Sequence, residues 1–461
     1  MSNKSIDLGT GKVSKLLFTL AVPTIIGQIV NLLYNIVDRI FIGKMPNGDL
    51  AMAGVGVAMP IILLVSAFAM LFAAGGAPLT AIEMGKKDND KAEEIMTNSF
   101  VMLIGIGIIL TILFLILKEP VLWAFGASNA TIGYGLDYLS IYLIGTVFVQ
   151  VALGMNLYIN TQGFTKIGMI TVIIGAVTNI ILDPILIFGF NMGVKGAALA
   201  TIISQGVSAT FILKFLFGKK TILKIRKKYL KLNKTLAFAM IALGVAPFIM
   251  QATESLVLVS LNNQLLKYGG DLAVGAMAII SSIMQLIIMP LMGFTQGGQP
   301  IMSYNFGAKQ MDRVKHTFKL LFIICLSYSF IVVASIMIFP EFFVSIFNNK
   351  KELVEITSWA MRIYFVGMAL FGAQIACQQT FLALGQAKIS LVIAMLRKIV
   401  LLVPLIFILP MFMEDGLTAV LLAEPVADII AIISTVVIFR IFYKKTFNNI
   451  NIIEEKTINN M

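Results

Sequence analysis

Four polar residues stand inside long apolar runs in the first half of the chain: Asp38, Asn179, Asp183 and Thr201. An ionisable side chain in the hydrocarbon core of a membrane costs about 2.5–3.5 kcal/mol, so it is expected to have a function or a partner. Two carboxylates, an amide and a hydroxyl at one depth would form an oxygen-rich site for Na⁺ or a proton. Neighbouring carboxylates repel each other when both are charged, so one of them can hold a proton near neutral pH.

Helix geometry predicts that the two acids share one depth in the membrane. Asp38 lies 23 residues after Lys15, and Asp183 lies 17 residues after Lys166, each on a helix that runs outward. At a rise of about 1.5 Å per residue, both acids reach the outer half of the bilayer. Asn179 lies four residues before Asp183 and therefore shares its helix face.

A purely structural role for the two acids stays open at this point. Asp38 can pair with its neighbour Arg39. Asp183 can bond to backbone groups that Pro184 leaves unpaired, because proline has no N–H. Both alternatives use intramembrane charges without any transported ion.

The second half of the chain does not repeat these acids, and its charges differ. Arg397 and Lys398 lie within an apolar segment, and Glu424 and Asp428, four residues apart in the last segment, could neutralise them. Intramembrane charges usually pair in this way. Glu254 has no such neighbour in the sequence, so we expect it to face a central cavity and contact substrate or ion. Together with Glu254, the candidates for a substrate cavity are four uncharged polar residues within predicted spans: Tyr34, Asn35, Asn156 and Gln251.

The composition requires that these residues lie in a membrane protein. Apolar residues make up 59% of the 461 residues and charged residues only 13%, whereas soluble domains carry about 25% charged residues. So few charges cannot cover a water-facing surface of this size.

The chain also has one histidine, His316, and two cysteines, Cys325 and Cys377, both in apolar runs. This inventory excludes a disulfide framework, a Cys/His zinc site and a His-based catalytic triad, so we expect neither an enzyme nor a cofactor.

A bilayer core needs about 20 apolar residues in a helix, and twelve segments of this kind are present. They span residues 16–43, 51–80, 95–118, 134–158, 167–190, 194–217, 236–265, 272–302, 316–339, 356–382, 389–412 and 417–443. The basic connectors around residues 86–91, 166, 218–234 and 309–315 all fall on the side that holds both termini. Positive connectors mark the cytoplasm, so both termini are predicted to be cytoplasmic. The net charge of +12 is thus explained by topology and lipid headgroups, and we expect no nucleic-acid partner.

The two halves of the sequence repeat each other at a shift of about 222 residues. Gly75-Gly76-Ala77-Pro78 recurs as Gly297-Gly298-Gln299-Pro300, and Gly85-Lys86-Lys87 recurs as Gly307-Ala308-Lys309. Six helices per half place both halves the same way up, as in transporters with parallel repeats and a central substrate site. We predict an N-lobe over 1–217, a basic linker over 218–234, a C-lobe over 235–443 and a cytoplasmic tail over 444–461. The predicted fold class is an all-α integral membrane protein with two pseudo-symmetric six-helix lobes.

The sequence resembles the multidrug and toxic compound extrusion (MATE) family over nearly its whole length. The resemblance rests on YNIVDRIFIG at residues 34–43, NIILDP at 179–184 and GVKGAALAT at 193–201. It implies the MATE fold and export of bulky, often cationic drugs in exchange for H⁺ or Na⁺. In one branch of the family, a coupling site in the N-lobe matches Asp38, Asn179, Asp183 and Thr201. In another branch, one acid on helix seven and one on helix ten bind Na⁺. Glu254 looks like the acid of helix seven, but the position of the helix-ten acid falls near Ala373, with no acid nearby. The missing acid favours the N-lobe site.

We therefore predict a multidrug antiporter of the bacterial plasma membrane that works by alternating access. Its partners would be small organic cations, drugs and membrane lipid, and we expect a monomer. A different interpretation is an exporter of lipid-linked precursors or metabolites, which would need a cationic central cavity for pyrophosphate. An integral-membrane enzyme is a third class, and it would need a cluster of His, Cys or metal-binding acids.

Overall fold

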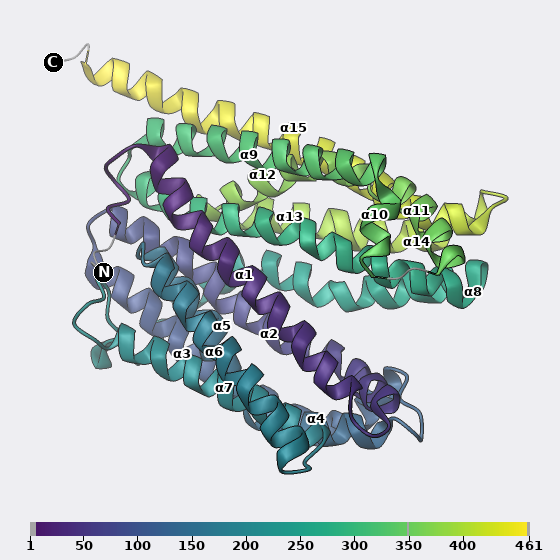
Figure 1. Cartoon of the computed structure of the whole chain (residues 1–461). Helices are drawn as coiled ribbons and strands as arrows, with labels where there is room; N and C mark the ends of the chain where they lie inside the picture. The colour runs from purple at the N-terminus through teal and green to yellow at the C-terminus, as the bar shows by residue number, and fades with distance from the viewer. Residues whose placement is uncertain (1–5, 348–349, 459–461) are drawn as a thin grey trace.

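The computed structural model describes residues 6–347 and 350–458, and this part of the chain is almost entirely helical, without a β-strand (Figure 1). The first seven helices are α1 (Val13–Gly43), α2 (Gly48–Gly85), α3 (Asn89–Ala124), α4 (Ile132–Ile144), α5 (Thr146–Thr161), α6 (Thr165–Pro184) and α7 (Val194–Leu216). The others are α8 (Lys234–Gly307), α9 (Met311–Ile338), α10 (Pro340–Ser345), α11 (Lys351–Tyr364), α12 (Phe371–Ala383), α13 (Ala387–Met395), α14 (Val403–Ile408) and α15 (Gly416–Ile458). Short π or 3₁₀ turns join some of them: η1 (Ile185–Gly189), η2 (Lys227–Tyr229), η3 (Gly367–Leu370), η4 (Leu396–Leu402) and η5 (Leu409–Met411).

The helices provide up to twelve membrane spans within the described residues, as the sequence predicted. Ten segments are long and apolar enough to cross a membrane, and two bent helix pairs complete the set. Helix α8 contributes two of the ten, Lys234–Gly270 and Leu272–Gly307. It changes direction at Gly270, whose φ of 64° is a conformation that glycine adopts without steric cost.

Two of the predicted spans are bent rather than straight. Residues 134–158 were expected as one helix, but α4 and α5 meet at 59° beside Gly145. Residues 356–382 were also expected as one helix, but α11 and α12 meet at 47° on either side of Gly367. Gly145 and Gly367 are 222 residues apart, so the sequence repeat extends to the shape of the helices.

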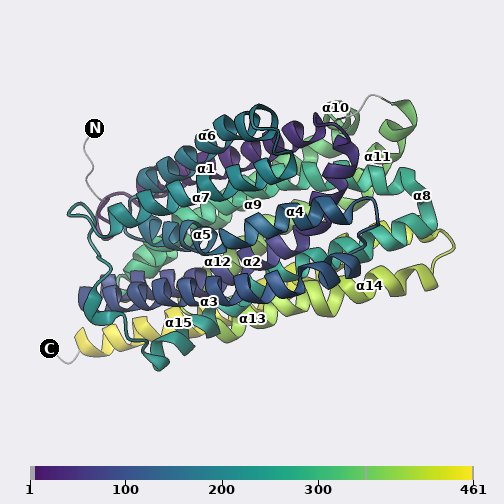
Figure 2. The ribbon, with the colours of Figure 1, turned by 90° about the horizontal axis from the view of Figure 1, so that it is seen from below.

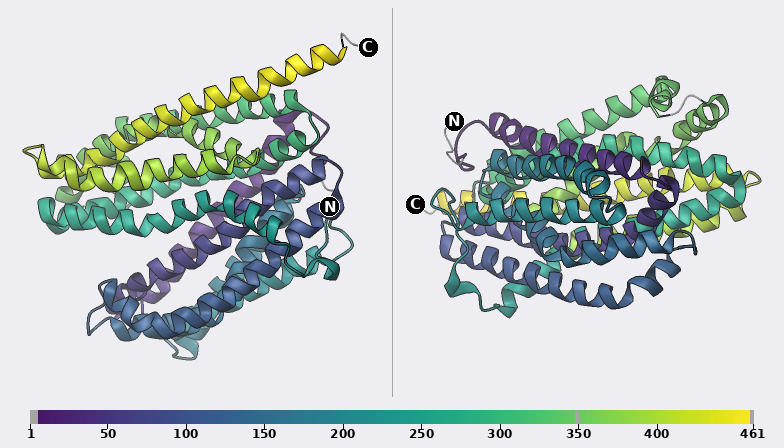
Figure 3. Two further views of the ribbon diagram at one scale, coloured as in Figure 1. Left: turned by 180° about the vertical axis from the view of Figure 1, so that it is seen from behind. Right: turned by 60° about the horizontal axis from the view of Figure 1, so that its bottom comes forward.

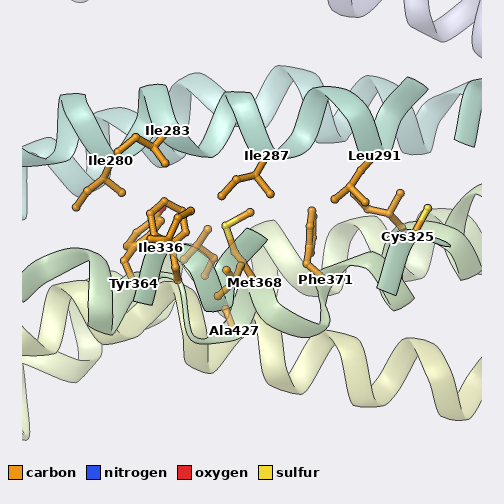
Figure 4. Packing of buried hydrophobic residues seen from close by; sticks show 14 of the residues in the cluster. Ile280, Ile283, Ile287, Leu291, Cys325, Ile336, Tyr364, Met368, Phe371 and Ala427 are labelled. Carbon is orange, nitrogen blue, oxygen red and sulfur yellow. The ribbon is translucent and has the colours of Figure 1, made fainter. Parts of the chain in front are cut away.

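The helices form two bundles that meet at the end holding both termini and diverge toward the other end (Figures 1 and 3). Figure 2 shows the same elongated body from below, with both termini at one end. The core of the second bundle is built on α8, where Ile280, Ile283, Ile287 and Leu291 face Tyr364 and the residues around it (Figure 4). Two further apolar cores hold the first bundle together.

The first helix of each half crosses to the other bundle near the closed end. Leu17 and Leu20 of α1 belong to the core of the second bundle. In the equivalent way, Gly244 of α8 packs directly on the backbone of Leu71 in α2. The two-lobe fold is therefore established, whereas the exact lobe boundaries at 217 and 234 stay a prediction.

Most of the predicted cytoplasmic tail over 444–461 is helical, because α15 continues to Ile458; its place in the cytoplasm stays a prediction. No glycine or proline follows Pro425 in the sequence, so nothing in this stretch breaks the helix. Residues 459–461 lie outside the described residues, as do residues 1–5 of the predicted N-lobe.

Candidate ion-coupling site

Asn179 and Asp183 lie side by side in the last turns of α6. Both side chains are fully buried, with 0% exposure, and the Asn179 Nδ2 donates a hydrogen bond to the Asp183 Oδ1 at 3.2 Å. Pro184 follows directly, and the chain then forms the π-helical turn η1. Because proline cannot donate to the helix ladder, a shift to wider π hydrogen bonding is a natural consequence at this point. The Asp183 carboxylate thus bonds to a side chain, which is not the backbone role considered as its alternative.

Asp38 of α1 lies within electrostatic reach of Asp183. Among the described residues, no ion pair joins Asp38 to its neighbour Arg39, although the guanidinium does act on Asp38 at longer range. Three buried oxygens of the cluster have no hydrogen-bond partner there: Asp38 Oδ1, Asn179 Oδ1 and Asp183 Oδ2. Buried polar atoms are normally hydrogen-bonded, so these three oxygens are free to contact a bound ion.

Thr201 of α7 is nearly buried, and its Oγ1 donates to the Ala197 carbonyl at 3.0 Å. The hydroxyl oxygen can therefore still accept a hydrogen bond or contact a cation. Tyr138 of α4 lies beside Thr201 and within electrostatic reach of Asp38 and Tyr34. The four predicted coupling residues therefore belong to one cluster. Asn179 hydrogen-bonds to Asp183, which is within electrostatic reach of Asp38. Tyr138 lies beside Thr201 and connects it to Asp38.

Tyr138 is the member of this cluster that sequence reasoning missed. Its ring stacks on that of Tyr142, with 6.0 Å between centroids and 18° between planes. Both phenols are buried in the first bundle. Two tyrosines four residues apart inside a predicted span were a visible signal, because buried phenols usually seek a polar partner. Tyr34, predicted as a cavity residue, is near both acids.

The arrangement offers oxygen ligands to a cation. Within the described residues, no group of three or more His, Cys, Asp or Glu side chains could hold a metal ion. Two carboxylates with an amide and a hydroxyl supply hard oxygen ligands, which suit Na⁺ as well as a proton. Either ion would neutralise the charge of buried acids that have no basic partner in direct contact.

Among the described residues, no hydrogen bond joins Asn35, Asn156 or Gln251 to the two acids, although Asn35 lies beside the Tyr34 hydroxyl. The Asn156 Nδ2 donates to the Gly168 carbonyl at 3.0 Å and also bonds to Thr171, so this amide ties α5 to α6. Asn35 is exposed and donates to the Asn31 carbonyl at 2.7 Å. Gln251 is partly buried on α8, one turn before Glu254.

The second bundle holds its charges in ion pairs. Arg397 Nε lies 2.6 Å from Asp428 Oδ1, and Arg397 Nη2 lies 3.1 Å from Glu424 Oε1. Lys398 Nζ lies 2.6 Å from Glu254 Oε2. The predicted neutralisation is therefore correct for Arg397 and wrong for Lys398, whose partner is Glu254.

Local backbone geometry explains this pairing. Both bases lie in the π-helical turn η4, in which consecutive side chains point in directions that a regular α-helix would not give them. Both are also nearly buried, at 9% exposure for the Arg397 side chain and 8% for that of Lys398. Paired and buried, they do not provide the open cationic surface that a pyrophosphate-bearing substrate would need.

The closed end is formed by a close contact between α2 and α8. A Cβ atom placed on Gly85 would lie 1.9 Å from the Tyr304 carbonyl oxygen, and one on Gly307 would lie 1.9 Å from the Ile82 carbonyl oxygen. Only glycine permits backbones to approach this closely. The two glycines are equivalent in the 222-residue repeat, so the contact lies where the two halves meet.

A strap of residues 6–12 reinforces the closed end. Leu8 is buried in the second bundle's core, and its carbonyl accepts from Asn305 Nδ2 at 2.9 Å. The guanidinium of Arg313 donates to the carbonyls of Leu8, Thr10 and Gly11 at 3.3, 3.1 and 2.8 Å. Arginine presents several donors in a rigid fork, so a single side chain fixes the strap to α9.

Comparisons with known proteins agree with this architecture. A family model described as MatE matches the chain twice, over residues 23–185 and 246–408. The Multidrug export protein MepA of Staphylococcus haemolyticus (strain JCSC1435) is 25% identical, over 95% of this chain and 96% of that protein. The MepA of Staphylococcus aureus (strain NCTC 8325 / PS 47) is 24% identical, over 92% of this chain and 93% of its own length.

Solved structures with the same fold include the MATE multidrug transporter DinF-BH. It is 34% identical, with a TM-score of 0.89, and the match covers 97% of this chain and 100% of that one. A crystal structure of MATE in the bent conformation is 23% identical, with a TM-score of 0.90, and covers 97% and 99% of the two chains.

Proposed function

This chain belongs to the MatE family, and we propose that it exports bulky, often cationic organic compounds in exchange for H⁺ or Na⁺. Its relatives are named as multidrug exporters, which makes it a multi-pass membrane transporter rather than an enzyme. Secondary transporters of this kind need no cofactor, because the ion gradient supplies the driving force. The coupling ion, the exchange mechanism and the substrates are parts of the proposal.

The observation that carries the proposal is the set of three unpartnered oxygens on Asp38, Asn179 and Asp183. A cation that enters from outside would bind there and neutralise the two carboxylates. Neutral acids no longer attract a cationic substrate, so binding of the ion and binding of the drug oppose each other. Such competition gives exchange, because a ligand shifts a conformational equilibrium by its difference in affinity for the two states.

Alternating access is supported by the shape of the molecule. The bundles contact closely at Gly85 and Gly307 and diverge at the opposite end. A rocking motion that separated this contact would open the end that holds the termini, while closing the other. Parallel repeats around a central site are well suited to such a motion.

Glu254 is a second element of the proposal, as an acid that cationic substrates contact. Its side chain is 45% exposed although its partner Lys398 is 8% exposed. The carboxylate therefore has one face on the buried lysine and another that a substrate can reach. A cationic drug at this face would compete with the lysine for the same charge.

We further propose that the protein lies in a bacterial plasma membrane as a monomer, with both termini in the cytoplasm. The basic connectors that share the side of the termini support this orientation. The lobes, on this view, are residues 1–217 and 235–443, with 218–234 as the linker. Nucleic acid has no place in this scheme, whereas membrane lipid does.

The experiment that tests the proposal is ethidium efflux from reconstituted vesicles with a proton gradient and a sodium gradient imposed separately. We expect efflux with one of the two gradients, which identifies the coupling ion. The Asp38→Asn and Asp183→Asn variants should insert into the membrane normally and lose this efflux. Normal efflux by both variants would refute the site, and no efflux by correctly inserted wild-type protein with either gradient would refute drug export.

A further inference from the structure

The linker between the bundles, residues 218–234, is held in a defined shape. Leu223 and Ile225 are buried, and the Gln162 Oε1 accepts from the Leu223 N–H at 2.8 Å. The Asn98 side chain on α3 accepts from the Asn233 N–H at 2.7 Å. With its backbone fixed on α3 and α5, the linker presents a constant set of side chains outward.

The linker is strongly basic and contains no acid. Its bases are Lys219, Lys220, Lys224, Arg226, Lys227, Lys228, Lys231 and Lys234. Two of them form ion pairs with the start of α3. Arg226 Nε lies 2.8 Å from Glu93 Oε2, and Lys228 Nζ lies 2.8 Å from Asp90 Oδ1. The hydrogen bond that Lys228 donates to the Asp90 carboxylate holds the pKa of Lys228 above its usual range, so this lysine stays charged. The other six form no ion pair within the described residues.

Exposed apolar side chains alternate with these lysines. Leu230 and Leu232 are 46% and 45% exposed on either side of Lys231, and Phe238 at the start of α8 is 74% exposed. A water-facing loop would not retain such side chains without reason. Lysine and leucine side by side are typical of surfaces that lie at the boundary between headgroups and acyl chains.

The position of the linker fits that boundary. It wraps the terminus-side end of α3 and leads directly into α8. Only 28% and 22% of the residues in the most apolar windows of these two spans are buried inside the structure, so both helices have exposed apolar surface that can contact lipid. Figure 2 shows the linker at the end of the molecule that holds the termini, on the outside of the bundles.

We propose that the linker is a docking surface for anionic phospholipids of the cytoplasmic leaflet. The unpaired lysines would contact the headgroup phosphates, and Leu230, Leu232 and Phe238 would enter the layer beneath them. This inference rests on the proposed cytoplasmic orientation but not on drug export.

The test measures retention of phosphatidylglycerol and phosphatidylcholine by the purified full-length protein, using native mass spectrometry with lipid titration. The variant Lys227→Gln/Lys231→Gln/Lys234→Gln removes three linker charges. Its control, Lys44→Gln/Lys267→Gln/Lys351→Gln, removes three exposed charges at the opposite end. Each lysine near an anionic surface is worth about a fivefold change in affinity, so the linker variant should bind phosphatidylglycerol about 100-fold more weakly.

Four results decide the inference. Wild type and the control variant should bind phosphatidylglycerol equally well and prefer it to phosphatidylcholine. The wild type should bind phosphatidylglycerol more tightly than soluble glycerol phosphate, and the Leu230→Ser/Leu232→Ser variant should lose this preference. Equal affinity of the linker variant and the control variant for phosphatidylglycerol would overturn the inference. Complete displacement of phosphatidylglycerol by glycerol phosphate would also overturn it, because the surface would then bind soluble anions. None of these readouts depends on transport, so failed drug export would leave the inference intact.

Discussion

Replacing Gly307 by alanine should loosen the closed end of the molecule. The new Cβ would lie 1.9 Å from the backbone oxygen of Ile82, far inside the 3.4 Å at which ordinary contact begins. The obstructing atom belongs to the backbone, so no side-chain rotation relieves the clash. Helices α2 and α8 must instead move apart by more than about 1 Å, in a packed region that resists such movement.

The size of the effect follows from the cost of overpacking. Forcing an extra methyl group into a close-packed contact typically costs about 1–3 kcal/mol. Under the proposed alternating access, only the state with this end closed contains the contact, so the whole cost would fall on that state. The equilibrium between the closed and open states of this end should therefore shift by about 5- to 150-fold toward the open one.

Spin labels can measure this shift directly. Asn89, just beyond the end of α2, and Gln310, just beyond the end of α8, are both exposed and can be replaced by labelled cysteines. The native cysteines Cys325 and Cys377 are buried, so they compete little for the label. We expect Gly307→Ala to add a population with a longer distance between the two labels, and to slow efflux.

The matched control is Gly105→Ala in α3, where a Cβ atom would meet nothing within 4 Å. This variant should leave both the distance distribution and the efflux rate unchanged. The equivalent change Gly85→Ala, which clashes with Tyr304, should reproduce the effect of Gly307→Ala. If both clashing variants instead behaved like the control, the glycine contact would not determine which end is open.

Three further predictions concern single charged groups. Asp183→Asn, like Asp38→Asn, should lower the affinity for the coupling cation by about 10- to 150-fold, because an interaction with a charged group worth roughly 1.5–3 kcal/mol is lost. Isothermal titration with Na⁺ measures this affinity, as does proton uptake by the protein followed with a pH-sensitive dye. Lys398→Met should lower the KM for ethidium by about tenfold, the effect of roughly 1.4 kcal/mol, and the gain should vanish when Glu254→Gln is added. Arg313→Gln should speed hydrogen exchange in the strap at least tenfold, since each bond to a charged group contributes about 1.5–3 kcal/mol. Unchanged exchange would show that the buried Leu8 and its hydrogen bond from Asn305 hold the strap without Arg313.

The sequence predicted the architecture well, because its signals are long and repeated. Apolar runs of about 20 residues require membrane-spanning helices whatever their detailed packing. The bends at Gly145 and Gly367 were not predicted, since hydropathy continues without interruption across both positions. A single glycine inside an apolar run is also compatible with a straight helix, so only packing could decide.

The candidate site was predictable where its residues are close in sequence. Asn179 and Asp183 share a helix face by their spacing of four, and the structure joins them by a hydrogen bond. Tyr138 lies on another helix, and its position beside Thr201 depends on how α4 and α7 pack. The Lys398–Glu254 pair was missed for a similar reason, because regular helix geometry does not predict where side chains of the π turn η4 point.

The two bundles treat buried charge in opposite ways, and this difference argues for where coupling occurs. In the second bundle, Arg397 is paired with two acids and Lys398 with a third. An incoming cation would have to displace a base that is already bound at 2.6 Å. In the first bundle, Asp38 and Asp183 form no ion pair with a base among the described residues. A buried charge without a partner is far more costly than a paired one. On the proposed antiport, the first bundle would therefore be the one whose stability changes most when an ion binds. A site can drive a conformational change only to the extent that the ion discriminates between the two states.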